Sequence, residues 1–504
     1  MKSNRNKTAN AQAGAAPNQL SNPKSGFNLS DILIVLFVAW AARAIFIWLL
    51  PTGIRSFDTL SWERQAELLK EGVNPYHANT LFNWPPFWMQ TVFVISKIAD
   101  FLNVPFFHVL QVCLILFESA LIIQVMRLIQ MLAPAAKVRW IVIIGIALNP
   151  IAILLVCQHC NFDVIMALWV SLAAASLLRY NVSNDPMDWL CACLFLGLGI
   201  LTKTVPLVLI PLLAGGFRKA TGVGRLLGAA LVLGPVTLGI SIIYVLAPAD
   251  VLHNVLGYRA ESLYFGFPGL LHWLGAEKSV AGARMAFYIL GIGIMALTWR
   301  HLWARHSFGN RETILYIALV LMAIPALGPG FGSQYFYWFL PFLVVSYACF
   351  AGRWRALLIG FGLISAITFI IEYGLNPAYG SSFIYWEAHA KTKEDLFHAL
   401  QYPKNQWFVA TARGVGWMMS QTNQTMERLP LFIGMLAIII FGARILLNGI
   451  EGPRKKWLWG LSGLYAFCVV LALAAGLGTK LSRAVAPPAG NSDSSQTNQT
   501  LPQN

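Results

Sequence analysis

Apolar runs long enough to cross a lipid bilayer recur along this chain, and they constrain its fold more than any other feature. A helix needs about 20 consecutive apolar residues to span the hydrocarbon core. Hydrophobic residues make up 57% of the 504 positions and charged residues 11%, against roughly 25% charged in soluble domains. Because a chain this apolar is soluble only in lipid, the sequence predicts an all-α polytopic membrane protein.

Thirteen such runs predict thirteen transmembrane helices. They occupy residues 31–51, 105–128, 139–157, 161–179, 187–202, 204–217, 224–247, 281–300, 312–328, 335–351, 354–374, 429–447 and 457–477. A further apolar segment, 85–103, opens with two prolines and carries Lys97 and Asp100. We interpret this segment as interfacial or re-entrant rather than as another span.

The net charge is explained by helix orientation. Lys and Arg outnumber Asp and Glu by 36 to 21, a formal charge of +15 that would indicate a nucleic-acid partner in a soluble protein. Here the basic residues gather in the N-terminal tail and in alternate short loops, which the positive-inside rule places in the cytoplasm. The acid-containing loops 52–84, 248–280 and 375–428 then lie outside. We therefore expect no nucleic-acid partner.

These assignments divide the chain into four parts. They are a polar cytoplasmic tail (1–30), a transmembrane module with external loop 52–84 (31–350), C-terminal transmembrane helices with external loop 375–428 (351–478), and a tail predicted to be disordered (479–504). The seven cysteines lie in or beside apolar runs, which argues against a disulfide framework. Cys157 and Cys160 lack a second pair to complete a zinc site.

The first outside loop carries Asp58, which follows a membrane exit and precedes a helix that is predicted to end at Gly72. An aspartate at this position can cap the helix N-terminus. It can also act as a general base at the membrane surface. Spacing leaves both interpretations open.

A polar hexad, Gln158 to Asp163, joins two apolar runs on the same outer side. His159 and Asp163 are either an interfacial histidine and a helix cap or functional side chains. Lys203 stands alone between the next two apolar runs. It is either a lysine that reaches the interface or a cation for an anionic head group.

Two further segments complete the outer face. Arg259, in the loop 248–280, is either a solvated loop charge or a bidentate phosphate ligand. Gln334 and Tyr335 begin an aromatic return into the membrane, which forms either a lipid groove or part of the aromatic belt. One carboxylate with nearby cations and aromatic walls suits sugar transfer from a lipid phosphate, because a carboxylate can deprotonate the acceptor hydroxyl and a cation can stabilise the departing phosphate.

In order and spacing, these motifs resemble the polytopic GT-C glycosyltransferases, above all the bacterial mannosyltransferase-like branch. The resemblance covers residues 30–350. It is carried by Asp58, Gly72 with Asn74-Pro75-Tyr76, Trp84-Pro85-Pro86, Gln158-His159 with Phe162-Asp163, Lys203 with Pro206, and Gln334-Tyr335 with Pro341.

The resemblance implies an inverting hexosyltransferase in the bacterial plasma (inner) membrane, with 31–350 as its catalytic module. It would move a sugar from a polyprenyl-phosphate sugar to a glycan, lipid or protein acceptor at the outer face. Asp58 would be the base, Lys203 and Arg259 would hold the lipid phosphate, and the remaining positions would contact substrate, namely His159, Asp163, Gln334 and Tyr335.

The first outside loop departs from the family in one respect. Many members carry two neighbouring acids there, whereas here Asp58 is followed only by Glu63 and Glu67 on the helix. This leaves a divalent metal possible, but we predict no metal and no cofactor beyond the lipid-linked sugar.

Two other classes of function are compatible with the sequence. A transporter or lipid flippase requires paired charges inside the membrane, for which Arg43 and Glu118 are the strongest candidates, although they could form one structural pair. A non-catalytic assembly scaffold predicts that Asp58→Ala has no effect.

Overall fold

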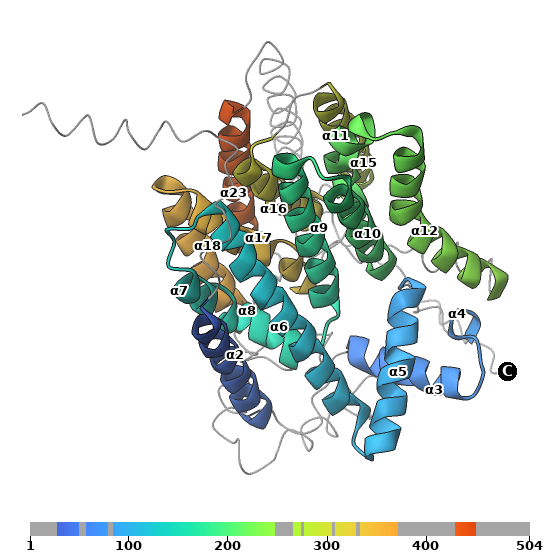
Figure 1. Ribbon diagram of the computed structural model, residues 1–504. Coiled ribbons are helices and arrows are strands. Elements are labelled where there is room, and N and C mark those ends of the chain that lie inside the picture. The colour runs from blue at the N-terminus through green and yellow to red at the C-terminus, as the bar shows by residue number, and fades with distance from the viewer. Residues whose placement is uncertain are drawn as a thin grey trace, which may run out of the picture.

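The computed structural model describes residues 28–49, 57–78, 84–246, 266–273, 277–304, 308–328, 333–370 and 429–449. Within these ranges every regular element is a helix (Figure 1). The all-α prediction is therefore confirmed for the described residues.

Six of the described helices are long and apolar enough to cross a membrane. They are α2 (Leu29–Leu49), α6 (Phe106–Leu132), α9 (Asp163–Ser183), α15 (Glu277–Trp303), α16 (Asn310–Leu327) and α23 (Leu429–Gly449). A seventh span is possible where α7 (Val138–Val142) and the π-helix η1 (Ile143–Ala147) meet α8 (Pro150–Cys157) at an angle of 52°. These helices identify a membrane-embedded protein, with fewer qualifying spans in the described residues than the thirteen predicted. The predicted span 457–477 lies outside the described residues.

Other helices follow most of the remaining predicted runs. They are α10 (Pro186–Thr202), α12 (Gly222–Leu246), α17 (Phe336–Cys349) and α18 (Arg353–Phe369), with α14 (Gly266–Trp273) before α15. The run 204–217 is predicted to be one transmembrane helix. It instead forms a 3₁₀ helix, η2 (Val205–Leu213), followed by α11 (Ala214–Lys219). Pro211 lies inside η2, where a proline disfavours the α-helix because its ring would clash with the carbonyl four residues earlier.

The first outside loop contains the predicted helix. α3 (Phe57–Lys70) ends two residues before Gly72, whose φ of +73° is the left-handed conformation expected of a glycine that terminates a helix. α4 (Pro75–Ala78) and α5 (Pro86–Leu102) follow. Lys70 Nζ lies 2.7 Å from the carboxylate of Asp100, so the end of α3 is joined to α5.

Ion pairs and hydrogen bonds between loops define one end of the helix bundle, which we call the basic end. Asp31, at the start of α2, pairs with Arg139, just beyond α6, at 3.1 Å. Lys219, the last residue of α11, donates to Asn184, just after α9, at 2.6 Å. Because α2 starts and α6 finishes at the basic end, the segment between them begins and ends at the opposite end. This course is compatible with a re-entrant or interfacial α5.

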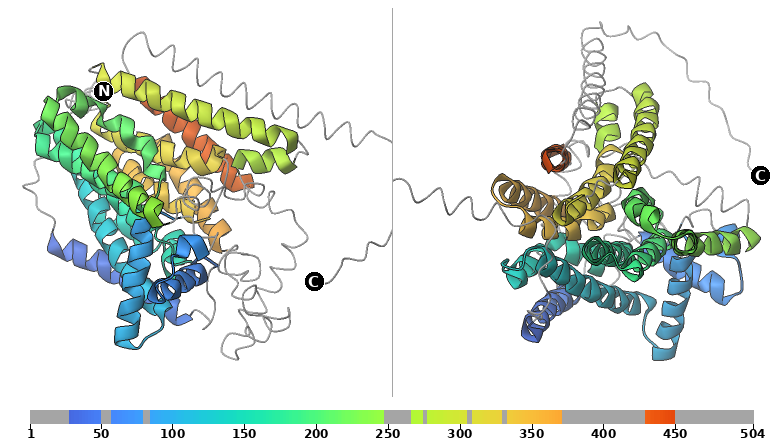
Figure 2. Two further views of the ribbon diagram at one scale, coloured as in Figure 1. Left: turned by 90° about the vertical axis from the view of Figure 1, so that its right-hand side faces the viewer. Right: turned by 45° about the horizontal axis from the view of Figure 1, so that its top comes forward.

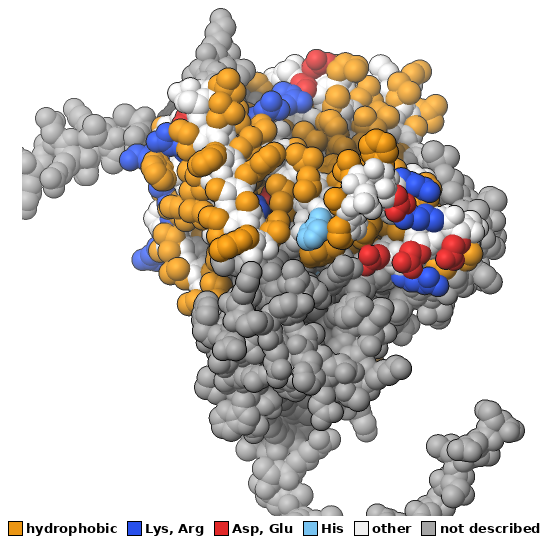
Figure 3. Space-filling view, turned by 90° about the horizontal axis from the view of Figure 1, so that it is seen from below, with side chains coloured by type: hydrophobic (Ala, Val, Ile, Leu, Met, Phe, Trp, Pro, Cys, Tyr) orange, Lys and Arg blue, Asp and Glu red, His pale blue; other side chains and the backbone are white. Residues whose placement is uncertain are grey.

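Among the described residues, the surface of the opposite end is largely apolar, with charged side chains gathered at one side (Figure 3). The sequence of α3 supplies Glu63, Arg64, Glu67 and Lys70. The sides of the bundle also carry exposed apolar side chains: Phe37 and Trp48 on α2 are 74% and 82% exposed. Such apolar surface is typical of a lipid-facing helix.

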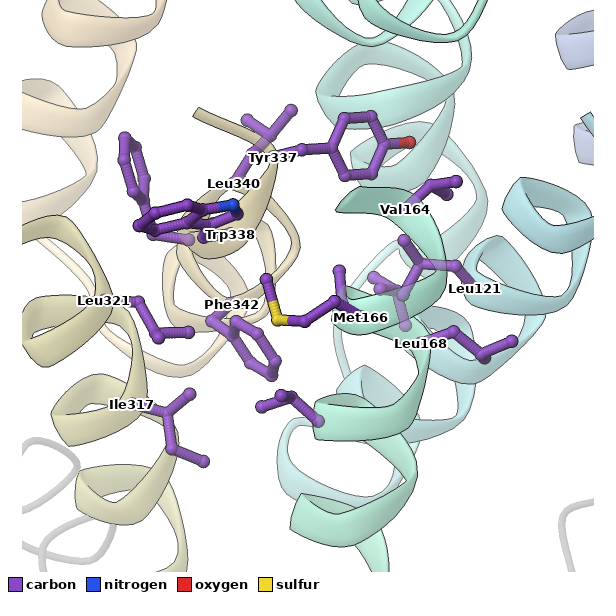
Figure 4. Close-up of a cluster of buried hydrophobic side chains, with 14 of the residues drawn as sticks. Leu121, Val164, Met166, Leu168, Ile317, Leu321, Tyr337, Trp338, Leu340 and Phe342 are labelled. Carbon is purple, nitrogen blue, oxygen red and sulfur yellow. The ribbon is translucent and has the colours of Figure 1, made fainter. Parts of the chain in front are cut away.

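The core is built around α9, which has α16 and α17 on one side and α6 on the other (Figure 2). Met166 of α9 and Phe342 of α17 face each other near its centre (Figure 4). Leu121 of α6 and Leu321 of α16 extend this core on the two sides. All four side chains are buried. Packing on both sides fixes the start of α9, which directly follows the polar hexad.

A buried charged network joins four elements beside this core. Arg43 of α2 makes two hydrogen bonds of 2.6 Å to the carboxylate of Glu118 on α6. Tyr337 of α17 donates to the same carboxylate at 2.6 Å, and Arg43 also donates to the backbone carbonyl of Ala147 in η1. A π-helix changes the backbone hydrogen-bond pattern, and here one of its carbonyls accepts from a guanidinium. The Arg43–Glu118 pair therefore joins α2, α6, α17 and η1, and we call it the joint between these helices.

We expect Glu118→Leu to destabilise the protein severely. It would leave the Arg43 guanidinium buried and unpaired, at a cost of about 3–5 kcal/mol. Thermal unfolding in detergent measures the loss. The exposed Glu67→Leu is the control, and should change stability by less than about 1 kcal/mol because its partner Arg64 is solvated. The double variant Arg43→Met/Glu118→Leu should recover much of the stability, and a double variant no better than the single one would contradict the assigned joint.

The two ends of the bundle should report opposite sides of the membrane. Alkaline phosphatase is active only outside the cytoplasm. We expect it to be active when it is fused after Gly72 and inactive when it is fused after Lys219, because the basic end should be cytoplasmic. Equal activity of both fusions would contradict this topology.

Candidate functional site

The carboxylate of Asp58 lies in the first turn of α3 and faces the hexad that precedes α9. Its Oδ2 atom lies 3.0 Å from Nε2 of His159 and accepts a longer hydrogen bond, 3.4 Å, from the Asn161 amide. Asp58 is 19% exposed, whereas the His159 side chain is 2% exposed. In the described residues no backbone N–H of α3 bonds to this carboxylate, so the geometry does not support the capping interpretation.

The hexad is a sharp turn between α8 and α9. Cys160 has a φ of +55°, a left-handed conformation that is uncommon for a residue with a side chain. The Asn161 side chain accepts a hydrogen bond from the backbone N–H of Asp163 at 2.9 Å. Asn161, one residue before the N-cap position Phe162, therefore binds the first backbone N–H of α9, and Asp163 is not the cap of this helix.

Two neighbouring helices hold this turn in place. Gln111 of α6 donates to the carbonyl of Cys157 at 2.6 Å, and Thr59 of α3 donates to the carbonyl of His159 at 3.2 Å. Both the backbone and the side chain of His159 therefore contact the first turn of α3. This pairing brings Asp58 and the hexad together although they are about a hundred residues apart in sequence.

A second polar group surrounds Asp163, the first residue of α9. Lys203, immediately after α10, lies 2.6 Å from Oδ1 of Asp163, and the Trp338 indole of α17 donates to Oδ2 at 2.8 Å. The Asp163 side chain is buried and that of Lys203 is 15% exposed. Lys203 therefore turns inward to a carboxylate, and does not extend to the interface.

Aromatic rings surround the Lys203 ammonium group. Its Nζ lies 5.0 Å from the ring centres of both Tyr335 and Trp338, and 5.4 Å from that of Phe162. Tyr335, in the 3₁₀ helix η4 (Ser333–Tyr335), stacks on Trp338 at 4.0 Å. Ring faces attract a cation within about 6 Å. The rings therefore help to hold the ammonium group in place.

An aromatic cluster connects the polar group around Asp58 with the polar group around Asp163. The Phe162 ring stacks on that of Trp88 of α5, with the ring centres 4.4 Å apart. The ring centre of Trp62 of α3 lies 5.8 Å from that of Phe162 and 5.0 Å from that of Trp88. The same Phe162 ring faces Lys203. One ring therefore connects the surroundings of Asp58 with those of Lys203.

Five of the predicted site residues are thus brought together: Asp58, His159, Asp163, Lys203 and Tyr335. Gln334 is half-buried on η4, and in the described part of the chain no hydrogen bond joins it to the other five. Arg259 lies outside the described residues.

Two members of the site were not among the predicted residues. Asn161 belongs to the predicted hexad, and its polarity was the only signal in the sequence. Trp338 follows Tyr335 by three residues and is one of several aromatic residues in that segment. Its hydrogen bond to Asp163 depends on a contact between α9 and α17 that spacing does not reveal.

The two cysteines of the hexad region, Cys157 and Cys160, are buried free thiols. Burial raises the pKa of Cys160 well above its ordinary value, so the thiol stays protonated. Among the described residues no three His, Cys, Asp or Glu side chains are grouped to hold a metal ion. Independence of a metal stays a prediction.

Compared with known proteins, this chain matches no protein-family model and no curated protein. Its function has to be inferred from the geometry of the site itself.

We expect the Asp163–Lys203 pair to be strongly coupled. Lys203→Met would leave a buried carboxylate without its cation, at a cost of about 3–5 kcal/mol. Lys203→Met/Asp163→Asn should be less destabilising than the sum of the single variants, as a double-mutant cycle of unfolding free energies would show. The exposed pair Lys70–Asp100 is the comparison, with an expected coupling of about 0.2–1 kcal/mol. Additive effects at Asp163 and Lys203 would contradict the pairing.

Proposed function

We propose that this protein is an inverting glycosyltransferase that moves a hexose from a polyprenyl-phosphate sugar to an acceptor hydroxyl. One observation carries the proposal. A partly exposed carboxylate, Asp58, is oriented by His159 and Asn161 beside an inward-facing lysine, Lys203, in an aromatic wall at one end of an apolar helix bundle.

Asp58 is suited to act as the general base. Its two protein partners in the described residues both contact Oδ2, so Oδ1 is the atom that can accept the proton of an acceptor hydroxyl. With its Nε2 protonated, His159 donates to the carboxylate and holds its orientation. A positioned carboxylate contributes about 10²–10⁴-fold to such a reaction.

Lys203 is suited to stabilise the leaving group. As the acceptor O–H bond breaks, its proton passes to Asp58 and the oxygen forms a bond to the anomeric carbon. The bond from that carbon to the phosphate oxygen breaks, and its electron pair leaves on the polyprenyl phosphate. The Lys203 ammonium group would stabilise this charge. A phosphate leaves without a general acid, so one carboxylate suffices.

Asp163 and His159 take positioning roles in this proposal, rather than the substrate contacts expected from the resemblance. Both oxygens of Asp163 have protein partners, Lys203 and Trp338. His159 is buried against α3 and directs its ring nitrogen to Asp58. Tyr335 and Trp338 then form the aromatic wall beside the cation.

The arrangement of the bundle supports a lipid-linked substrate at the outer face. The site lies at the end opposite the basic loops, which the positive-inside rule places in the cytoplasm. Apolar helix surfaces give a polyprenyl chain access from the bilayer. We therefore place the site at the outer face of a bacterial plasma membrane, with a glycan, lipid or protein as acceptor.

The rival proposal, a transporter or flippase, relied on Arg43 and Glu118. Together with Tyr337 and the Ala147 carbonyl, these residues form a closed network that joins helices. A joint of this kind gives no particular support to a transport pathway.

We expect Asp58→Asn to lower the turnover number about 10²–10⁴-fold with little change in stability, because the amide keeps the side-chain shape and loses the basic oxygen. Transfer from a panel of polyprenyl-phosphate hexoses in nanodiscs measures the effect. Asp100→Asn on α5, an exposed carboxylate, is the matched control and should keep full activity. Unchanged turnover in Asp58→Asn would refute the base assignment.

A further inference from the structure

A set of buried polar atoms without protein partners lies on the face of α3 that carries Asp58. Positions 58, 61, 62 and 65 follow the i, i+3, i+4, i+7 spacing of one helix face. In the described part of the chain, the Ser61 hydroxyl, both polar atoms of the Gln65 amide and the indole N–H of Trp62 are buried with no hydrogen-bond partner. The indole N–H of Trp88, on the adjacent α5, has none either.

This concentration is unusual within a folded protein. The large majority of buried side-chain polar atoms have a hydrogen-bond partner. Here four neighbouring side chains contribute five unsatisfied atoms, and Gln65 is 0% exposed. Each unpartnered buried atom lowers stability. Partners supplied by a ligand would account for the arrangement.

The chemistry of these groups identifies the class of ligand. They are a neutral amide, a hydroxyl and two indoles, with no charged side chain among the four. The amide and the hydroxyl both donate and accept, which matches sugar hydroxyls. The Trp62 and Trp88 rings pack edge to face with their centres 5.0 Å apart, and their unpartnered indole N–H groups can donate to sugar hydroxyls. A phosphate would instead require cations, and Lys203 lies across Phe162 from this cluster.

We propose that Ser61, Trp62, Gln65 and Trp88 form the subsite that binds the hydroxyl groups of the transferred sugar. This inference rests on the proposed function, and it separates recognition of the sugar, on α3 and α5, from recognition of the phosphate, at Lys203. Asp58 lies one turn before Ser61 on the same face, which places the base beside the sugar. All four side chains are buried, so binding of a sugar here would require α3 and α5 to move apart.

Gln65→Met is the informative variant, because methionine has a similar length and no polar group. Since the Gln65 amide has no partner in the described residues, we expect the thermal unfolding midpoint without ligand to stay unchanged or to rise. Affinity for the polyprenyl-phosphate hexose that wild type binds most tightly should fall about tenfold, as for two lost hydrogen bonds. Affinity for polyprenyl phosphate without a sugar should stay unchanged. Glu67→Met, on the exposed face of α3, is the matched control and should change neither affinity.

Ser61→Ala tests the same subsite with a smaller change, and should shift the preference among mannose, glucose and galactose donors. Equal affinity of wild type and Gln65→Met for the hexose lipid would overturn the inference, as would an equal loss for both lipids. Lower stability of Gln65→Met with unchanged binding would mark the cluster as structural and overturn the inference too. The proposed function fails separately, if wild type transfers sugar from no donor in the panel. The comparison of the two lipids still tests the subsite in that case, because binding is measured without turnover.

Discussion

Lipid cannot hydrogen-bond a peptide group, so inside the bilayer the backbone of this chain has to satisfy itself within helices. Polar turns are consequently confined to the two ends of the bundle. One end holds the basic connections near Arg139 and Lys219. The other holds α3, α5 and the turn between α8 and α9. The constraint that makes helices also gathers distant polar residues into one place, which is how Asp58 comes to contact His159.

Within that end, the site is built from pairs rather than single residues. Asp58 is oriented by His159, and Lys203 is held by Asp163. Phe162 is the shared wall of the two pairs and connects them with the rings of α3 and α5. Each functional group therefore has a partner that restrains it, which is the arrangement that a catalytic group needs to keep its geometry.

The sequence revealed the helical class and most of the residues that meet at the site, because charges beside apolar runs are few. Asp58, His159, Asp163 and Lys203 could be selected on that basis alone. Their roles could not be predicted, because which side chains pair with each other depends on which helices pack together. Local spacing also missed the 3₁₀ helix after Lys203, where Pro211 lies inside the helix and disfavours the α form. It missed the unpartnered polar atoms of Ser61 and Gln65 as well, because their burial depends on how α3 packs.

The joint at Arg43 has a consequence for assembly. α2 exposes much of its apolar surface, and its arginine is held by Glu118, 75 residues later in the chain, and by a carbonyl of the π-helix beyond that. During synthesis α2 enters the membrane before either partner exists, and an unpaired arginine at the centre of a span costs about 2.5–3.5 kcal/mol on insertion scales. Docking of α2 on these partners can therefore follow only after α6 and η1 have been made.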